Sequence, residues 1–260
     1  MQLRFALLTV VIVVGLFLGM LLSLELGRRL GIRQIAKRGK DAQAGIGVVD
    51  SAVYALLALL IGFSFSGAAS RFDARRELIV REVNAISSAW QYLDVLPPES
   101  RGTLQDDLRR FVDQLLAIYG DQENTARYLR DRPELQAIQG QLWTHAVAAV
   151  TDPRGERARM LVLPSLTQMF DSVDEERLAR RMHPPAIVFI MLALTALAGA
   201  LFAGYSMASG QARNWIYIIG ITATISIATY VIVELEFPRL GVVRVNAFDQ
   251  TLVELRETMR

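Results

Sequence analysis

Four segments of the chain are apolar over about 20 residues each, which is the length that an α-helix needs to cross a lipid bilayer. They span residues 5–24, 48–69, 185–207 and 215–235. Trp215 and Tyr217 open the last segment, where amphipathic aromatic rings favour the membrane interface. The first segment is long for a cleaved signal peptide, and no small-residue cleavage site follows it promptly, so we expect it to be retained. The pattern predicts a multi-pass integral membrane protein with four transmembrane helices.

Charged residues are concentrated between the second and third apolar segments. The chain is 52% hydrophobic and still 21% charged, and the charge lies mainly in its middle. We therefore expect an all-α membrane protein in which two transmembrane pairs flank a soluble domain. The predicted parts are a first pair with a basic connecting loop (1–69), a soluble helical bundle (70–184), a second pair (185–235) and a C-terminal tail (236–260).

Apolar residues in the middle of the chain recur at steps of four and three, which is the repeat of an amphipathic helix. The second apolar segment meets no helix breaker before Pro97 and Pro98, so its helix should continue into the bundle. The stripes that predict four bundle helices are Phe72, Ile79, Val83, Ile86, Trp90 and Leu93; Leu104, Leu108, Phe111, Leu115 and Ile118; Leu135, Ile138, Leu142 and Ala149; and Leu166, Phe170 and Val173.

Small residues recur inside the apolar segments at the spacing of one helix face. Such residues let helix backbones approach closely in lipid, although small residues are also common in any span by chance. The three candidate stripes are Gly15 and Gly19; Ala196, Ala200 and Gly204; and Gly220, Thr224 and Ala228. The pattern does not say whether these contacts lie within one subunit or between subunits.

Residue content argues against several kinds of site. The chain has no cysteine, and its two histidines, His145 and His183, are too few for a histidine-built metal site. No phosphate-binding glycine loop, metalloprotease helix or nucleophile elbow is present, so we expect no enzyme, no cofactor and no metal. A net charge of +2 without a basic stripe argues against nucleic acid as a partner. We interpret His145 as a structural residue and His183 as a residue of the membrane boundary.

One face of the second apolar segment changes from apolar to hydroxyl-bearing residues. Ala55, Leu59, Phe63, Ser66 and Ser70 fall along this face when the segment is helical. An apolar ring followed by hydroxyls is typical of a constriction that opens into a wetter vestibule. The alternative is a packed span whose serine hydroxyls bond back to the helix.

Charged residues stand at the ends of the second and fourth segments. Arg71 and Arg75 follow the second segment, and Glu234 and Glu236 end the fourth. Carboxylates near a membrane are costly unless they are paired or wet, so these four residues are candidates for charges at the mouth of a pore. The alternatives are a solvated helix face for the arginines and a simple interface marker for the carboxylates. Asp50, near the start of the second segment, has the same two interpretations.

Two stretches of sequence resemble a known family. Residues 63–101, which begin FSFSGAASRFDARR, resemble the bestrophin-like family of membrane proteins, and residues 235–245, LEFPRLGVVRV, are similar to its second signature. A more distant similarity to true bestrophins rests on the match of Gly62, Phe63, Ser66, Ser70, Arg71 and Phe72 with the end of their pore-lining helix.

This resemblance implies a pentameric, most often anion-selective ion channel. The three bulky apolar residues of the bestrophin neck would fall on Ala55, Leu59 and Phe63, of which Phe63 alone keeps an aromatic ring. The acidic calcium clasp of animal bestrophins has no counterpart after the fourth segment, so calcium gating is not implied.

The charge pattern and the resemblance imply opposite orientations in the membrane. Short basic loops stay in the cytoplasm, which would place the 26–48 connection there and the bundle outside. Bestrophin analogy places the bundle inside. The basic residues of the connection are Arg28, Arg29, Arg33, Lys37, Arg38 and Lys40, against Asp41.

Taken together, the sequence predicts an oligomeric ion channel of a bacterial inner membrane. Its partners would be copies of itself, five in all as the resemblance implies, together with the lipid bilayer and small inorganic ions. The alternative is a non-conducting membrane sensor or docking module whose helical bundle binds a partner.

Overall fold

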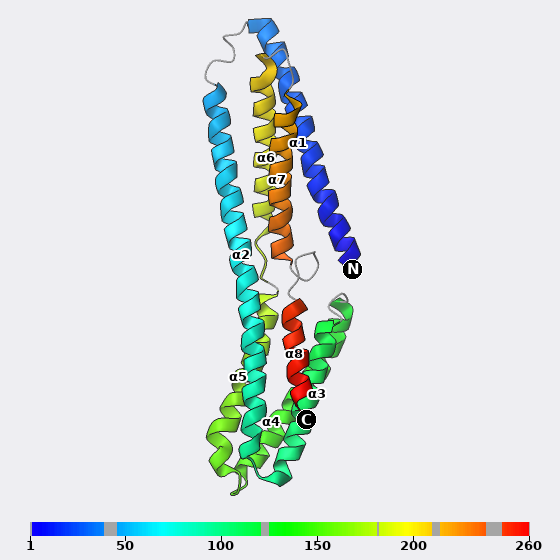
Figure 1. Ribbon diagram of the computed structural model, residues 1–260, viewed down its shortest axis with the longest axis vertical. Helices are drawn as coiled ribbons and strands as arrows, with labels where there is room; N and C mark the ends of the chain where they lie inside the picture. The colour runs from blue at the N-terminus through cyan, green and yellow to red at the C-terminus, as the bar shows by residue number, and fades with distance from the viewer. Residues whose placement is uncertain are drawn as a thin grey trace. The chain divides into compact units, whose positions relative to one another are not determined.

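Every regular element in the part of the chain that the structure describes is helical (Figure 1). The structure is a computed structural model that describes residues 2–38, 46–120, 125–180, 182–209, 214–237 and 246–259. The helices are α1 (Gln2–Arg38), α2 (Ile46–Tyr92), α3 (Pro98–Gly120), α4 (Thr125–Thr151), α5 (Arg159–Ala179), α6 (Ala186–Ser206), α7 (Trp215–Glu236) and α8 (Asn246–Thr258). Short 3-10 turns cover Leu93–Val95, Glu156–Ala158 and Met207–Ser209. The all-α prediction is confirmed.

Four helices among the described residues are long and apolar enough to cross a bilayer, as predicted. They are α1, α2, α6 and α7. The third and fourth predicted segments match α6 and α7 to within about two residues at each end. The first helix differs, because it continues beyond residue 24 to Arg38 and carries much of the predicted basic loop as helix. Residues 25–38 are rich in helix-forming Leu, Arg, Gln and Lys, and Arg29 pairs with Glu25 one turn earlier at 2.9 Å.

The chain divides into two compact units, each described here by itself. One unit contains Gln2–Phe72 and His183–Val243, and the other contains Asp73–Met182 and Arg244–Arg260, as far as these residues are described. The first is the membrane unit and contains the apolar lengths of α1, α2, α6 and α7. The second is the bundle unit and contains the rest of α2 with α3, α4, α5 and α8.

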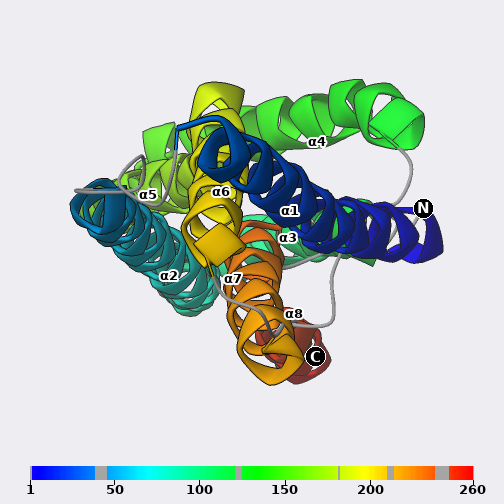
Figure 2. The ribbon, with the colours of Figure 1, turned by 90° about the horizontal axis from the view of Figure 1, so that it is seen from above.

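In the membrane unit, α6 and α7 pack along α1 (Figures 1 and 2). The closest approach is between backbones. A Cβ added to Gly204 of α6 would lie 1.9 Å from the Leu24 carbonyl oxygen, and one added to Gly27 of α1 would lie 1.9 Å from that of Leu201. Only glycine permits such a contact, so these two positions set how closely α1 and α6 can pack.

The three predicted small-residue stripes differ in how closely they pack inside one subunit. Ala196, Ala200 and Gly204 are buried in the helix packing, which confirms the packing interpretation for this stripe. A Cβ on Gly15 or on Gly220 would meet no atom of the described residues within 4 Å. The first stripe is therefore open at Gly15 but packed at Gly19, where a Cβ would lie 3.2 Å from Leu197 Cδ2, and the third stripe is open at Gly220.

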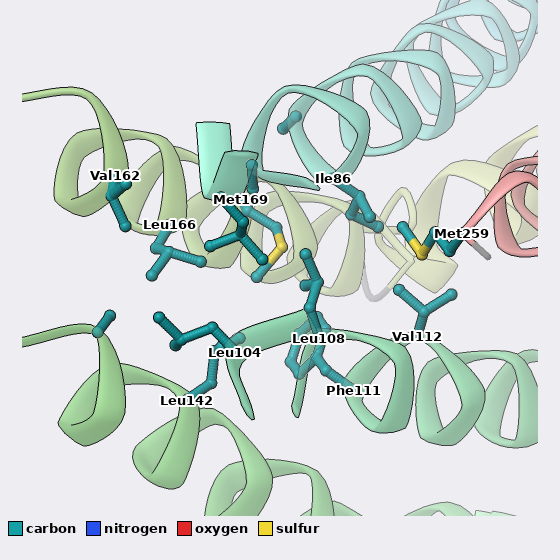
Figure 3. Close-up of a cluster of buried hydrophobic side chains, with 14 of the residues drawn as sticks. Ile86, Leu104, Leu108, Phe111, Val112, Leu142, Val162, Leu166, Met169 and Met259 are labelled. Carbon is teal, nitrogen blue, oxygen red and sulfur yellow. The ribbon is translucent and has the colours of Figure 1, made fainter. Parts of the chain in front are cut away.

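The bundle unit has one hydrophobic core, to which all five of its helical segments contribute (Figure 3). Ile86 of α2, Leu108 of α3, Leu142 of α4 and Leu166 of α5 are each fully buried there. These residues belong to the apolar stripes seen in the sequence, so the four-three spacing correctly predicts four bundle helices and their buried faces.

The C-terminal tail adds a helix that the sequence did not predict. Leu252 and Met259 of α8 are buried in the bundle core. Arg256 holds Asp113 of α3 with Nε–Oδ1 and Nη2–Oδ2 distances of 2.7 and 2.9 Å, and Arg109 of α3 donates to the Met259 carbonyl at 2.9 Å. The tail is therefore part of the bundle unit.

Candidate functional site

The face of α2 predicted from the sequence is exposed along its whole length in the membrane unit. Ala55, Leu59, Phe63, Ser66 and Ser70 are all exposed, and 69% of Phe63 is accessible. With 3.6 residues per helical turn, this face points roughly opposite to the side that packs on the rest of the unit. That packed side is marked by Leu57, Ile61 and Ala68.

Within the subunit, α2 is packed on one narrow side. Of residues 48–70, all of which the structure describes, Leu57 and Ala68 alone are buried. By contrast, α7 buries Ile218, Thr222, Ile225 and further residues down to Glu236. Most of the surface of the apolar length of α2 is therefore left open to lipid or to other subunits.

The hydroxyls of Ser66 and Ser70 bear on the two interpretations of the α2 face. Neither makes a hydrogen bond with any described residue. Some hydroxyls of the membrane unit bond back to their own helix, as Thr195 does to the Met191 carbonyl and Thr224 to the Gly220 carbonyl, both at 2.8 Å. Ser64 of α2 and Ser226 of α7, like Ser66 and Ser70, make no hydrogen bond within the described residues, so the hydroxyls alone do not decide between the two interpretations.

At the end of this face, Arg71 forms an ion pair with Glu236 of α7. The Arg71 Nε lies 2.9 and 3.2 Å from the two carboxylate oxygens, and Nη2 lies 2.8 Å from Oε2. The Glu236 side chain is fully buried, whereas 35% of the Arg71 side chain is accessible. Such an arginine–carboxylate pair is charge-assisted and fixes geometry as well as charge. It ties the end of the exposed α2 face to the end of α7.

His183 completes this cluster from the segment that precedes α6. Its Nδ1 lies 3.3 Å from Glu236 Oε1, and its ring stacks on Phe237 with centroids 4.6 Å apart. A carboxylate can only accept, so Nδ1–H is the donor. The histidine that the sequence placed at the membrane boundary is a second partner of the buried carboxylate.

The other two charge candidates do not join this pair. Glu234 is buried two positions from the end of α7 and is hydrogen-bonded by Tyr230, one turn earlier. Arg75 lies in the bundle unit, where Nη2 donates to the Met182 carbonyl at 2.9 Å and Nε to that of Ala179 at 3.5 Å. Arg75 is buried there and binds the carbonyl end of α5, so the solvated-face alternative does not describe it.

Asp50, at the other end of the α2 membrane segment, accepts a hydrogen bond from the Ser206 hydroxyl at the end of α6.

In the bundle, His145 bonds to Asp107, whose side chain is only 1% accessible. This contact supports the interpretation of His145 as a structural residue. Among the described residues, no three His, Cys, Asp or Glu side chains are placed to hold a metal ion.

A buried polar cluster in the bundle was missed from the sequence. The Tyr119 hydroxyl lies 3.0 Å from both oxygens of the buried Glu82, and Arg180 pairs with Glu176 one turn earlier on α5. The Arg180 guanidinium lies 4.1 Å over the Tyr119 ring. Burial, and next the charge of Glu82, raise the pKa of Tyr119 well above its ordinary value. The signal was present, because Glu82 follows Ile79 by three residues and precedes Ile86 by four, which puts a carboxylate on an apolar stripe.

Comparison with known proteins gives one family and one fold. The model of the Bestrophin-like domain matches residues 14–247. A point mutant of a bacterial bestrophin homologue from Klebsiella pneumoniae has a TM-score of 0.62 at 19% identity, over 92% of this chain and 99% of that one. Another structure of that bacterial homologue has a TM-score of 0.61 at 19% identity, over 91% of this chain and 98% of that one. A structure of a point mutant described as a membrane protein has a TM-score of 0.65 at 20% identity, over 92% of this chain and 96% of that one. A search of curated proteins gives no match.

Proposed function

The chain belongs to the Bestrophin-like family, and on this premise we propose that it is a homo-oligomeric ion channel whose pore is lined by α2. Leu59 and Phe63 form the apolar constriction, with the small Ala55 one turn before them. Ser66 and Ser70 line the wetter vestibule that follows. An apolar ring resists wetting and controls ion passage without a physical plug.

One observation carries this proposal. The face of α2 that carries Leu59 and Phe63 is exposed along its whole length within one subunit, and it ends in the exposed hydroxyls of Ser66 and Ser70, which make no hydrogen bond within the described residues. Unsatisfied polar groups are costly in hydrocarbon, and water in a vestibule removes that cost. The α2 face is better suited to a water-filled path than to lipid.

Oligomerisation follows from the geometry of one subunit. Four membrane helices are too few to enclose a pore, and α2 leaves its proposed lining face uncovered. Copies of α2 arranged about a common axis bring these faces together. Family resemblance favours five subunits and anion conduction in a bacterial inner membrane. Arg71 lies one residue beyond Ser70, and its charge is paired with that of Glu236.

The direct test joins subunit count with conduction. Native mass measurement of the full chain in mild detergent should give a closed ring of four or five subunits. The same preparation in planar bilayers should carry current, and reversal potentials in a salt gradient give the ion selectivity. A stable monomer without current would overturn the proposal.

The second candidate is a non-conducting sensor or docking module whose bundle binds a partner. It is favoured by a cavity of about 840 Å³ in the bundle unit. In that case the oligomer, if formed, should carry no current.

A further inference from the structure

The bundle unit contains a cavity between α3, α4 and α5, and its lining shares no residue with the α2 face. Its volume of about 840 Å³ is within the range of small-molecule sites. The described residues that line it all belong to the bundle unit. Sites of this kind are mostly apolar, with a few polar groups that fix the orientation of the ligand.

One wall of the cavity is aromatic and aliphatic. Trp143 of α4 and Phe170 of α5 meet edge to face, with ring centroids 6.5 Å apart, and Leu115 and Ile118 of α3 extend the apolar surface. Trp143 remains 37% exposed, so part of its indole is available to a ligand. This wall suits the hydrophobic body of a small molecule.

The arginines that line the cavity are already paired. Arg177 Nη2 lies 2.8 Å from Asp174, and Arg180 is held by Glu176 and by the face of Tyr119. The buried Nη2 of Arg180 has no hydrogen-bond partner, but the charge of each arginine is already balanced by a neighbouring carboxylate. Neither arginine therefore offers an unpaired positive charge to a ligand anion.

One carboxylate of the lining is in surplus. Among the described lining residues, three acids, Asp171, Asp174 and Glu176, face two arginines, so these residues together carry one net negative charge. Asp171 follows Phe170 directly and has no ion-pair partner among the described residues. It places a negative charge beside the aromatic wall, and both groups attract a cation.

We propose that this cavity binds an amphipathic organic cation, with an apolar body against Trp143 and Phe170 and an amine directed to Asp171. The polar cluster of Glu82 and Tyr119 holds α2 and α3 together beside the cavity, so the α3 wall is in place before the ligand arrives. The site goes beyond conduction, because it depends only on residues of the bundle unit.

The test uses the full chain in detergent and three probes of one shape: 3-phenylpropylamine, its neutral alcohol 3-phenylpropanol and its acid 3-phenylpropanoate. Calorimetric titration is corrected with protein-free micelles. The combined emission of Trp90, Trp143 and Trp215 is followed with excitation at a wavelength that the probes do not absorb. We expect saturable binding of the amine and at least tenfold weaker binding of the alcohol and the acid.

Two variants locate the site. Asp171→Asn should weaken amine binding about tenfold or more, because it removes the charge of the one described charged lining residue that has no ion-pair partner. Glu175→Gln on the same helix removes the same charge but does not line the cavity, and it should leave amine binding unchanged. Absence of saturable binding, equal binding of amine and alcohol, stronger binding of the acid, or equal loss in both variants would each overturn the proposal. Asp171 is exposed, so its substitution does not threaten the fold.

Discussion

Arg71 of α2 and Glu236 of α7, which are 165 residues apart in sequence, form an ion pair in which the carboxylate is fully buried. From the sequence alone, each of the two residues was a separate candidate for a charge at a pore mouth. Their pairing gives them a shared structural role, because it fastens the end of the proposed lining helix to the end of the last membrane helix. Movement of α2 at this point requires the pair to break or to move as one body.

Glu236→Gln should destabilise the protein by about 1–3 kcal/mol. Removing one partner of a buried pair is costly, and the partial exposure of Arg71 moderates the loss. The measurement is the midpoint of thermal unfolding in detergent. Glu77→Gln is the control, because it removes the same charge from an exposed pair with Arg81 at 3.7 Å. An equal loss of stability in both variants would show that the buried pair contributes no more to stability than the exposed one.

Gly204→Ala should destabilise the membrane unit by about 1–3 kcal/mol, since the new methyl group would lie 1.9 Å from the Leu24 carbonyl oxygen and force α1 and α6 apart. Gly220→Ala on α7 is the matched control, because a Cβ there meets nothing within 4 Å of the described subunit. Its effect on the unfolding midpoint should be small. If Gly220→Ala instead breaks the oligomer into smaller species, that glycine packs between subunits.

The fold was predictable from the sequence where the signal is local, and hidden where it depends on distant partners. The apolar runs and the four-three stripes specify the spans and the bundle helices, because burial alone determines them. The approach of Gly27 and Gly204 was not predictable, since these residues are 177 positions apart, as the difference of their residue numbers gives. The α8 helix was missed although its signal is local, because Phe248, Leu252, Leu255 and Met259 recur at steps of four and three in the tail.

The same distinction between local and long-range signals applies to the candidate site. The exposed α2 face could be predicted because a helix fixes the relative directions of Ala55, Phe63 and Ser70 whatever surrounds them. The partners of Glu236 could not, because Arg71 and His183 come from other parts of the chain. Whether the face lines a pore depends on contacts between subunits, which neither one sequence nor one subunit contains.

Tyr119 should make stability sensitive to alkaline pH. Its pKa in the folded chain is raised above the unfolded value of about 10, so the folded state holds the phenolic proton more tightly. The contribution to stability is complete below about pH 10 and is lost as pH rises from there through the folded pKa. Unfolding midpoints measured from neutral pH upwards should therefore fall more steeply above about pH 10 in the wild type than in Tyr119→Phe.

Tyr119→Phe should also cost about 1–3 kcal/mol at neutral pH, since Glu82 loses its hydroxyl donor. Tyr92→Phe, an exposed position on α2, is the control and should resemble the wild type at every pH. Parallel pH curves for wild type and Tyr119→Phe would contradict the assignment.

Orientation can be settled by labelling single cysteines, because the chain contains none of its own. Lys37→Cys near the end of α1 and Met160→Cys in the bundle are both exposed positions separated by one span, α2, so they should label from opposite sides. The basic connection predicts that Lys37→Cys is cytoplasmic. If an impermeant maleimide reaches Lys37→Cys in intact cells and not Met160→Cys, the bundle is inside, as bestrophin analogy implies.

Phe63→Ala tests the proposed pore directly, and Phe65→Ala provides its control. Both rings are exposed on α2 in one subunit, at 69% and 46%, but two residues of helix turn them about 200° apart. If α2 lines a pore through the face of Phe63, truncating that ring widens and hydrates the constriction. Conductance or open probability in bilayer recordings should then rise.

Phe65→Ala removes the same ring from another side of the helix and should leave the current unchanged. Phe189→Ala in α6 should likewise behave as a packing variant, with reduced stability and no gain of current. Equal currents in the wild type and Phe63→Ala would remove Phe63 from the constriction. A complete absence of current in the wild type and all three variants, from a preparation shown to be correctly folded, would favour the non-conducting module instead.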